Sequence, residues 1–345
     1  MLDKNIKYYR LKNNMTRKAL AEAVGVTPMN ITFYENGERR PSMGVLKKMA
    51  DVLGVTVTDF LAAGSTDLQF VHGKFRKQSG MNSMEQEYVR AYVEEYCGRF
   101  FQTVDFLGGI KILGDVPVTG SIPYCDDHEE ASRRLREYLG LSRNEPVSSL
   151  TDILENRGII VLFMDISNDH FSGMNGTVNN IPYIVVNQNM SPARIRSTIV
   201  HETAHFVFSW PQSMSEKEEE AAATAISGAF LFPKESVIRE LGYRISVISR
   251  AMTLTCREYG ISMFMLAKRA RLCNVISSNT EKEFYVKASQ AGWRKNEPDW
   301  DIPMEQPSLF RQLVYRAVTE EEISVQKGAE LLKTSYDSVV KACYI

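Results

Sequence analysis

Apolar residues recur every three or four positions along most of the chain, and this spacing predicts a protein built mainly of α-helices. The first 62 residues divide into five such segments. Thr16 is placed to cap the second helix, Gly25 to end it, and Thr27-Pro28 to open the third. A helix, a glycine turn and a second capped helix form a helix-turn-helix. We therefore expect a five-helix domain over residues 1–62.

Small and polar residues at 62–67 indicate a domain boundary, and a second helical pattern follows. Its apolar positions run from residue 84 to 107 and predict one helix of about 25 residues, capped by Ser83. The stripe Tyr88-Tyr92-Tyr96 favours packing, either on the next domain or against a second copy of the chain. We assign residues 63–128 to a linker that contains this helix.

Residues 129–275 mix helical patterns with short β-branched runs at 159–164, 171–178 and 182–187, which predicts an α+β domain with a small sheet. The last of these strands is a candidate to accept an extended peptide as an added strand. Residues 276–345 form a helical C-terminal region. We expect a helix to begin at 319–322, within a unit shaped like a helix-turn-helix. The acidic front of that unit favours packing or protein interaction over DNA contact.

The run Ile199–Phe208 contains the motif H-E-x-x-H inside an apolar segment. On a helix, His201 and His205 lie one turn apart on the same face, so both imidazoles can reach one zinc ion. Glu202 follows the first histidine and can lie beside the metal without binding it, where a general base accepts a proton from water. A small sheet followed by such a helix is the zincin arrangement. The other interpretation is a core helix that happens to carry two histidines.

A catalytic zinc site needs a third protein ligand as well as water. After Trp210-Pro211, Ser215 is placed to cap a helix that holds glutamates at 216, 218, 219 and 220. A glutamate near the start of this helix can reach back to the metal. The residues alone do not choose among the four.

Net charge and cysteine content limit the remaining possibilities. The 345-residue chain has a net charge of −1, but residues 1–62 carry ten basic and six acidic residues, or about +4. Five scattered cysteines without C-x-x-C indicate reduced thiols. The first residues show no hydrophobic signal segment, and no apolar run reaches the roughly 18 residues of a membrane helix. We expect a soluble cytoplasmic protein without a membrane partner.

The run T-R-K-A-L-A-E-A-V-G-V-T-P-M-N-I-T-F-Y-E-N-G-E-R-R-P resembles the Cro/repressor (XRE) family of DNA-binding domains. The resemblance implies a recognition helix from Thr27 to about residue 34 in the major groove of DNA, bound as a possible homodimer. The alternative is a protein-interaction module of the same fold. The base contacts that it implies are Thr27, Met29, Asn30, Thr32 and Phe33. The phosphate contacts that it implies are Arg17, Arg39 and Arg40.

Residues 129–240 resemble the ImmA/IrrE metallopeptidases, in the runs L-E-N-R-G-I-I-V, F-S-G-M-N-G, I-P-Y-I-V-V-N, R-I-R-S-T-I-V-H-E-T-A-H and E-x-x-A-x-x-I-S-G-A-F-L-F-P. Thr203-Ala204 replaces the usual leucine-glycine between the histidines. The family motif implies Glu220 as the third zinc ligand, with Glu219 as runner-up.

Together the two resemblances imply a DNA-binding regulator with zinc endopeptidase activity, whose substrate is a repressor- or antitoxin-like protein. The alternative is a regulator or antitoxin in which the zinc domain is a non-catalytic sensor or scaffold.

Overall fold

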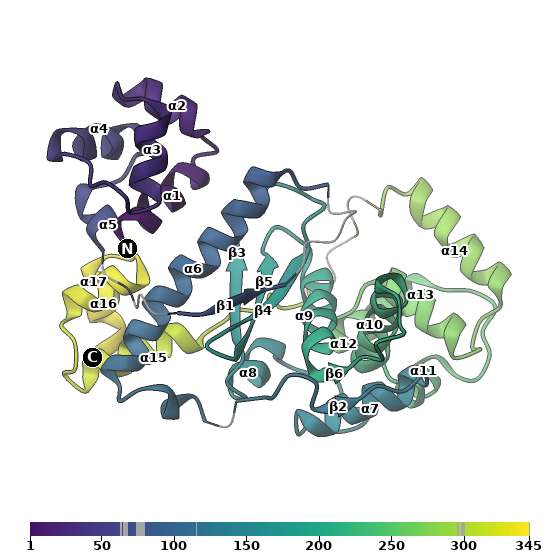
Figure 1. Ribbon diagram of the computed structural model, residues 1–345. Coiled ribbons are helices and arrows are strands. Elements are labelled where there is room, and N and C mark those ends of the chain that lie inside the picture. Colours follow the sequence, from purple (N-terminus) through teal and green to yellow (C-terminus); the bar gives the residue numbers. More distant parts are fainter. Residues whose placement is uncertain are drawn as a thin grey trace. The chain divides into compact units, whose positions relative to one another are not determined.

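The computed structural model describes residues 1–344 except 63, 65–67, 74–79, 115, 295–296 and 298–300 (Figure 1). The chain forms two compact units: unit 1 holds residues 1–114, 177–180 and 308–345, and unit 2 holds residues 115–176 and 181–307. The α+β, mostly helical fold class is confirmed. In the part of the chain that is described, no helix combines the length and apolar character that a membrane span requires.

The N-terminal part of unit 1, residues 1–62, is called the head below, and it has the five expected helices. They are α1 (Leu2–Lys12), α2 (Arg17–Val24), α3 (Pro28–Glu35), α4 (Met43–Leu53) and α5 (Val57–Leu61). The hydroxyl of Thr16 accepts from the N–H of Ala19, and Gly25 ends α2 at φ 75°, as the sequence predicts. Ile6, Leu20, Ile31, Met49 and Phe60 are fully buried, so each of the five helices contributes to one core.

The long helix of unit 1 is α6 (Ser83–Phe106), and its cap is Asn82 rather than Ser83. The Asn82 side chain accepts from the N–H groups of residues 84 and 85, which leaves Ser83 as the first helical residue. The tyrosine stripe does pack, but within this chain. Tyr8 of α1 lies 6.3 Å from Tyr88 and 6.5 Å from Tyr92 between ring centroids.

The C-terminal helices of unit 1 pack against the other end of this stripe, at Tyr96. They are α15 (Leu309–Thr319), α16 (Val325–Leu332) and α17 (Tyr336–Cys343). Phe310 lies 5.1 Å from Tyr96. The prediction that a helix begins at 319–322 is wrong, because Thr319 ends α15 and the next helix starts after its cap, Ser324. The short elements β1 (Phe70–His72) and η1 (Ile110–Leu113) also belong to unit 1.

Lys333 joins the C-terminal helices to α6 and to the head. It ends α16 in the left-handed conformation, with φ 52°. Its Nζ lies 2.8 Å from Oε1 of Glu95 on α6 and 4.7 Å from the ring centroid of Tyr8. Arg99 pairs with the same carboxylate at 2.8 Å. The two ends of the chain are therefore folded into one unit.

Unit 2 contains the main strands, except that the end of β4 and the turn after it, residues 177–180, belong to unit 1. These are β3 (Ile160–Met164), β4 (Gly173–Val178) and β5 (Ile181–Asn187), and β5 lies between the other two. The pairing of β3 and β5 is parallel, with Ile160 opposite Tyr183. Asn179-Asn180 connects β4 to β5 with φ of 49° and 64°, which suits a tight hairpin turn. Since β5 already has a neighbour on each side, the prediction that it accepts an added peptide strand is wrong.

Helices make up the rest of unit 2. They are α7 (His128–Tyr138), α8 (Leu150–Glu155), α9 (Pro192–Val207), α10 (Glu216–Leu231), α11 (Lys234–Leu241), η2 (Arg250–Met252), α12 (Thr253–Tyr259), α13 (Met263–Leu272) and α14 (Ser278–Gln290). Strands β2 (Ile122–Pro123) and β6 (Phe208–Ser209) form a small separate pair. Helix α9 packs on β5 and on α10, so the H-E-x-x-H helix has apolar support on two sides.

A buried ion pair fixes the start of α9. The Glu305 carboxylate accepts from the N–H groups of Leu150 and Thr151 at 3.0 and 3.1 Å, and it pairs with Arg196 of α9. Both charged side chains are almost fully buried. Arg196 also lies against Gly260, which has φ 63°. The segment before Pro307 is thereby anchored to the helix that carries the histidines.

Candidate metal centre

The two histidines of α9 face each other across one helical turn. Their Nε2 atoms are 3.0 Å apart, and both side chains are about nine-tenths buried. Neighbouring residues such as Ile199, Val200 and Phe206 are in the core and hold the helix in place. The imidazoles therefore stand on a rigid support and share one small space.

Glu220 of α10 reaches this same space. Its carboxylate oxygens lie 3.3 Å from Nε2 of His205 and 3.4 Å from Nε2 of His201. These three side chains form the group of potential ligands that the described residues bring together. Ligand atoms bound tetrahedrally to zinc at 2.0–2.1 Å are about 3.3 Å from one another. The separations of 3.0, 3.3 and 3.4 Å therefore fit a single zinc ion.

The other glutamates at the start of α10 have different surroundings. Glu218 forms a capping box with Ser215, in which its carboxylate accepts from the N–H of Ser215 at 2.9 Å. Glu219 lies 2.8 Å from Nδ1 of His205, on the ring edge turned away from the shared space. It is therefore placed to orient that ring. Thr224 is within 3.3 Å of Nδ1 of His201 in the equivalent position.

These contacts also determine the electrostatics of the pair. Burial on its own would lower the pKa of His205, but hydrogen bonds to Glu219 and Glu220 outweigh it and raise this pKa to about 9. Partners on the far nitrogens set the tautomer that leaves Nε2 available to a metal. The site thus has the outer contacts typical of a metal-binding histidine pair.

Glu202 lies beside this group and is 96% buried. Its Oε2 accepts a hydrogen bond from Nδ2 of Asn175 on β4, at 2.8 Å. Gly173, two residues earlier on the same strand, lies so close that an added Cβ would be 2.7 Å from Thr198. The strand therefore runs directly along the base of the site. Sequence reasoning missed Asn175, because only the register of β4 against α9 brings it to Glu202.

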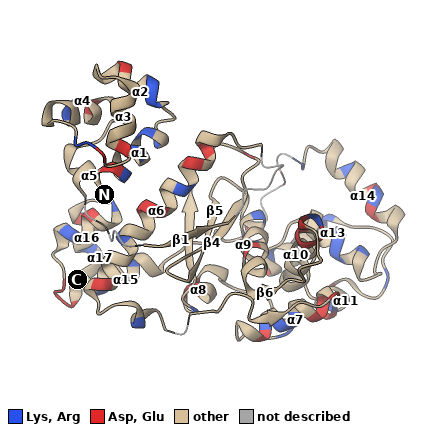
Figure 2. Ribbon diagram, viewed as in Figure 1, with Lys and Arg blue, Asp and Glu red and all other residues tan. Residues whose placement is uncertain are grey.

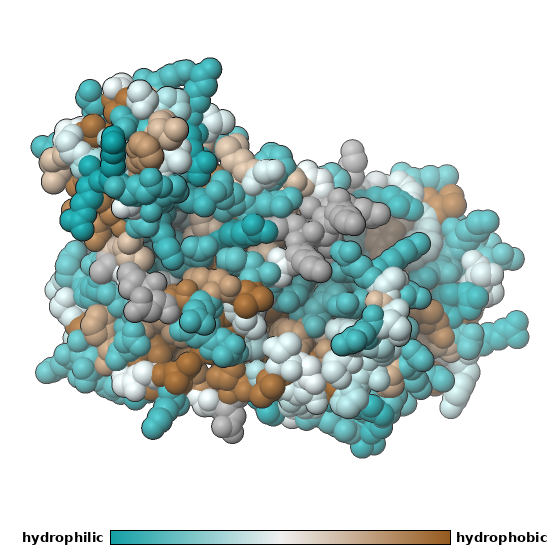
Figure 3. Space-filling view, in the orientation of Figure 1, coloured by the Kyte–Doolittle hydropathy of each residue, from teal (hydrophilic) through white to brown (hydrophobic). Residues whose placement is uncertain are grey.

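The residues predicted to contact DNA lie around α3 of the head. Thr27 caps the helix, Met29 is 59% exposed, and Asn30, Thr32 and Phe33 are partly exposed. Basic residues occur on α1 and α2, and α3 itself has none (Figure 2). The surrounding face is mostly hydrophilic, with scattered apolar residues (Figure 3).

The three predicted phosphate contacts differ in their surroundings. Arg40 is exposed, and the guanidinium of Arg39 lies over the ring of Phe33, 4.8 Å from its centroid. Arg17 is partly engaged within the head, because its Nε donates to the buried Glu35 at 2.7 Å. The contact of any of these residues with DNA stays a prediction.

Two family models match the chain. One, described as helix-turn-helix, matches residues 6–60, and the other, described as the IrrE N-terminal-like domain, matches residues 154–271. The chain belongs to the helix-turn-helix family and carries an IrrE-like domain. It is thus a DNA-binding transcriptional regulator of the helix-turn-helix type with a peptidase-like second domain, which confirms both resemblances. The IrrE-like domain includes α9 and α10, and with them the candidate metal ligands.

Three relatives match part of the chain, and each is named an HTH-type transcriptional regulator. One from Archaeoglobus fulgidus is 36% identical over 63 residues, which is 18% of this chain and 89% of the relative. One from Methanocaldococcus jannaschii is 37% identical over 54 residues, covering 16% of this chain and 82% of the relative. One from Sinorhizobium fredii is 30% identical over 94 residues, which is 27% of this chain and 60% of the relative.

Proposed function

We propose that the IrrE-like domain of this regulator is a zinc-dependent endopeptidase, and that it cleaves a repressor- or antitoxin-like protein. The observation that carries the proposal is the arrangement around His201, His205 and Glu220: three ligand atoms spaced for one zinc ion, with Glu202 beside them but outside the group. The resemblance to ImmA/IrrE peptidases supports the class of substrate.

In this proposal, each polar residue around the site has a separate role. Glu202 is placed to accept a proton from water and return it to the departing amine, while Asn175 holds its carboxylate in one orientation. Glu219 and Thr224 keep the imidazole rings turned toward the metal. A zinc ion in the site would supply Lewis acidity, which polarises the peptide carbonyl and lowers the pKa of water.

A non-catalytic zinc sensor is the competing function, and Glu202 distinguishes the two. A buried carboxylate costs stability unless it is well paired, and a zinc site that serves only structure does not need one next to the metal. The presence of Glu202 beside the ligand group, with a hydrogen-bond donor of its own, therefore supports catalysis.

The proposal is tested with the Glu202→Gln variant, because glutamine keeps the shape of the side chain and removes its basicity. Helix-turn-helix repressors and antitoxins encoded beside the gene serve as candidate substrates, and cleavage is followed by mass spectrometry. We expect the wild-type protein with zinc to cut one of them. The variant should hold the same amount of zinc and shift the same DNA, but lose cleavage.

Cleavage that survives in Glu202→Gln would refute the enzymatic role. If the wild-type protein binds zinc and cleaves no candidate, while DNA binding depends on zinc, the sensor function is supported instead. His201→Ala is the metal-free control.

A gel shift on the region upstream of the gene tests the head separately. We propose that the head contacts DNA through the exposed residues of α3 and through Arg40, as a homodimer on two half-sites. A shift that Met29→Ala and Asn30→Ala both leave unchanged would refute this placement.

A further inference from the structure

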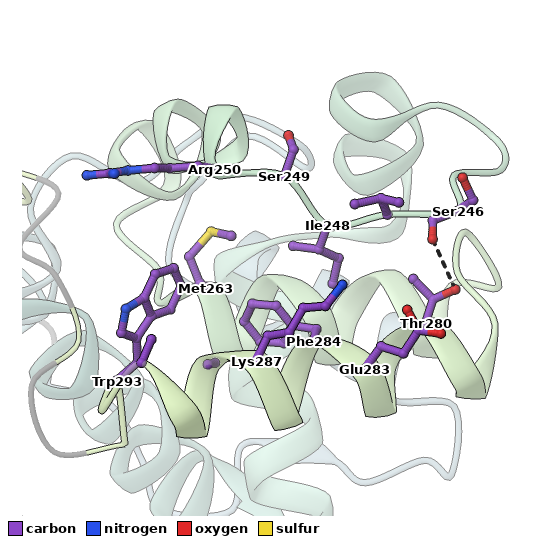
Figure 4. A pocket seen from close by; sticks show the side chains of 13 residues that line it. Ser246, Ile248, Ser249, Arg250, Met263, Thr280, Glu283, Phe284, Lys287 and Trp293 are labelled. Atoms are coloured by element: carbon purple, nitrogen blue, oxygen red, sulfur yellow. Dashed lines mark hydrogen bonds between the residues drawn. The ribbon is translucent and has the colours of Figure 1, made fainter.

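Unit 2 contains a cavity of about 230 Å³ well away in sequence from the metal ligands (Figure 4). One wall is the segment 246–250, and the other is α14. Ile248, Met263, Phe284 and Trp293 form its apolar lining, with Phe284 and Met263 between the two walls. At one end the hydroxyl of Thr280 donates to the carbonyl of Ser246 at 3.4 Å, which ties the walls together.

The aromatic rings of the lining are apolar and meet at an interplanar angle of 67°. Phe284 is 92% buried, and its ring centroid is 6.4 Å from that of Trp293. Phe264 packs behind it at 5.6 Å, so the ring of Phe284 is fixed in place. A planar aromatic group fits such a corner, because it can stack on one ring while its edge meets the other.

The cavity lining also contains charged side chains. Lys287 and Arg250 both line the cavity, and among the described residues neither side chain has an ion-pair or hydrogen-bond partner, although the Arg250 side chain is directed away from Lys287. Figure 4 shows the Lys287 side chain crossing in front of Phe284, with its amino group directed toward Ile248. Glu283, one turn before Lys287, also lines the cavity, so the lining has two cationic groups and one anionic group.

We propose that this cavity binds a small aromatic carboxylate. Its ring lies between Phe284, Met263 and Trp293, and its carboxylate pairs with Lys287. A volume of about 230 Å³ lies below the usual range for drug-sized ligands, which limits the ligand to one or two rings. Glu283 disfavours a second negative charge on the ligand, since like charges at close range repel.

Isothermal titration of the full-length protein tests the proposal with three probes. Indole-3-acetate has the ring and the carboxylate, tryptamine has the same ring with a positive charge, and acetate has the charge alone. We expect indole-3-acetate to bind at least about tenfold more tightly than either of the others, because only it satisfies both the apolar lining and the ammonium group of Lys287. Equal binding of tryptamine, or no measurable heat with indole-3-acetate, would overturn the proposal.

Three variants locate the binding. Ala291→Trp places a large side chain in the cavity and should abolish binding. Lys287→Ala should weaken it about tenfold. Lys282→Ala removes the same charge from the same helix outside the cavity and should leave binding unchanged. Equal losses in the two lysine variants would show that the lysine effect is general electrostatics, and binding that survives Ala291→Trp would place the ligand elsewhere. Circular dichroism confirms that each variant is folded.

Discussion

Adjacent glutamates on α10 are predicted to affect zinc binding by very different amounts. Glu220→Gln replaces a carboxylate whose oxygens lie 3.3 and 3.4 Å from the two histidine nitrogens with a neutral amide, a poor zinc ligand. Glu219→Gln changes a group that touches only the far nitrogen of His205, and the amide oxygen still accepts that hydrogen bond.

The expected magnitudes follow from these positions. If a zinc-binding free energy of roughly 10 kcal/mol is shared among three protein ligands, losing one costs about 3 kcal/mol, or more than about 100-fold in Kd. Weakening an outer contact costs about 10-fold when an acceptor is retained. We therefore expect Glu220→Gln to bind zinc at least about tenfold more weakly than Glu219→Gln.

Competition with a chromophoric chelator at constant pH measures both dissociation constants. Glu216→Gln is the matched control, because it removes the same charge from an exposed position in the first turn of α10. Its affinity should stay within about twofold of wild type, as expected for an exposed charge. The reverse order of the two main variants would make Glu219 the ligand, and equal losses in all three would show that only the net charge of α10 matters.

Three further predictions concern other parts of the chain. Asn175→Ala should lower kcat for peptide cleavage about 10- to 100-fold at unchanged zinc content, because it removes a hydrogen bond to the carboxylate of Glu202. Steady-state kinetics together with metal analysis checks this prediction, and an unchanged kcat would contradict it. Gly260→Ala should lower the free energy of unfolding of unit 2 by more than about 1 kcal/mol in urea titrations, since a Cβ would lie 2.3 Å from Nε of Arg196. Gly25→Ala is the control: it has the same left-handed strain with open space around it, and it should lower the free energy of unfolding of the head by less. Arg40→Ala should weaken DNA binding by the same factor for all sequences, and it should reduce the slope of log K against log salt concentration by about one. Gel shifts at several salt concentrations measure both effects. A loss confined to one operator would instead indicate a base contact.

Local features of the sequence were enough to predict much of the fold. Thr16 and Gly25 mark the ends of α2 because caps and left-handed turns depend on single residues. The spacing of His201 and His205 determines a shared helix face by itself, and their Nε2 atoms do meet. The neighbouring possibilities Asn82 and Ser83 could not be separated, since both are good caps one residue apart.

Long-range pairing accounts for what the sequence could not predict. Asn175 meets Glu202 only because β4 runs along α9, and nothing in its local sequence marks it. The tyrosine stripe of α6 indicated packing, but its partners, Tyr8 and Phe310, come from opposite ends of the chain. The wrong prediction for β5 has the same origin, because the order of strands depends on residues far apart in sequence.

The contact between Lys333 and Glu95 has a consequence for biosynthesis. At 5–20 residues per second, the ribosome adds Lys333 roughly 12 to 50 seconds after Glu95. During that interval the nascent head already has all of its own residues, while Tyr8 still lacks the ammonium group that covers it in the finished protein. A message truncated before its last codons would therefore yield a regulator whose DNA-reading end is intact but whose support is incomplete.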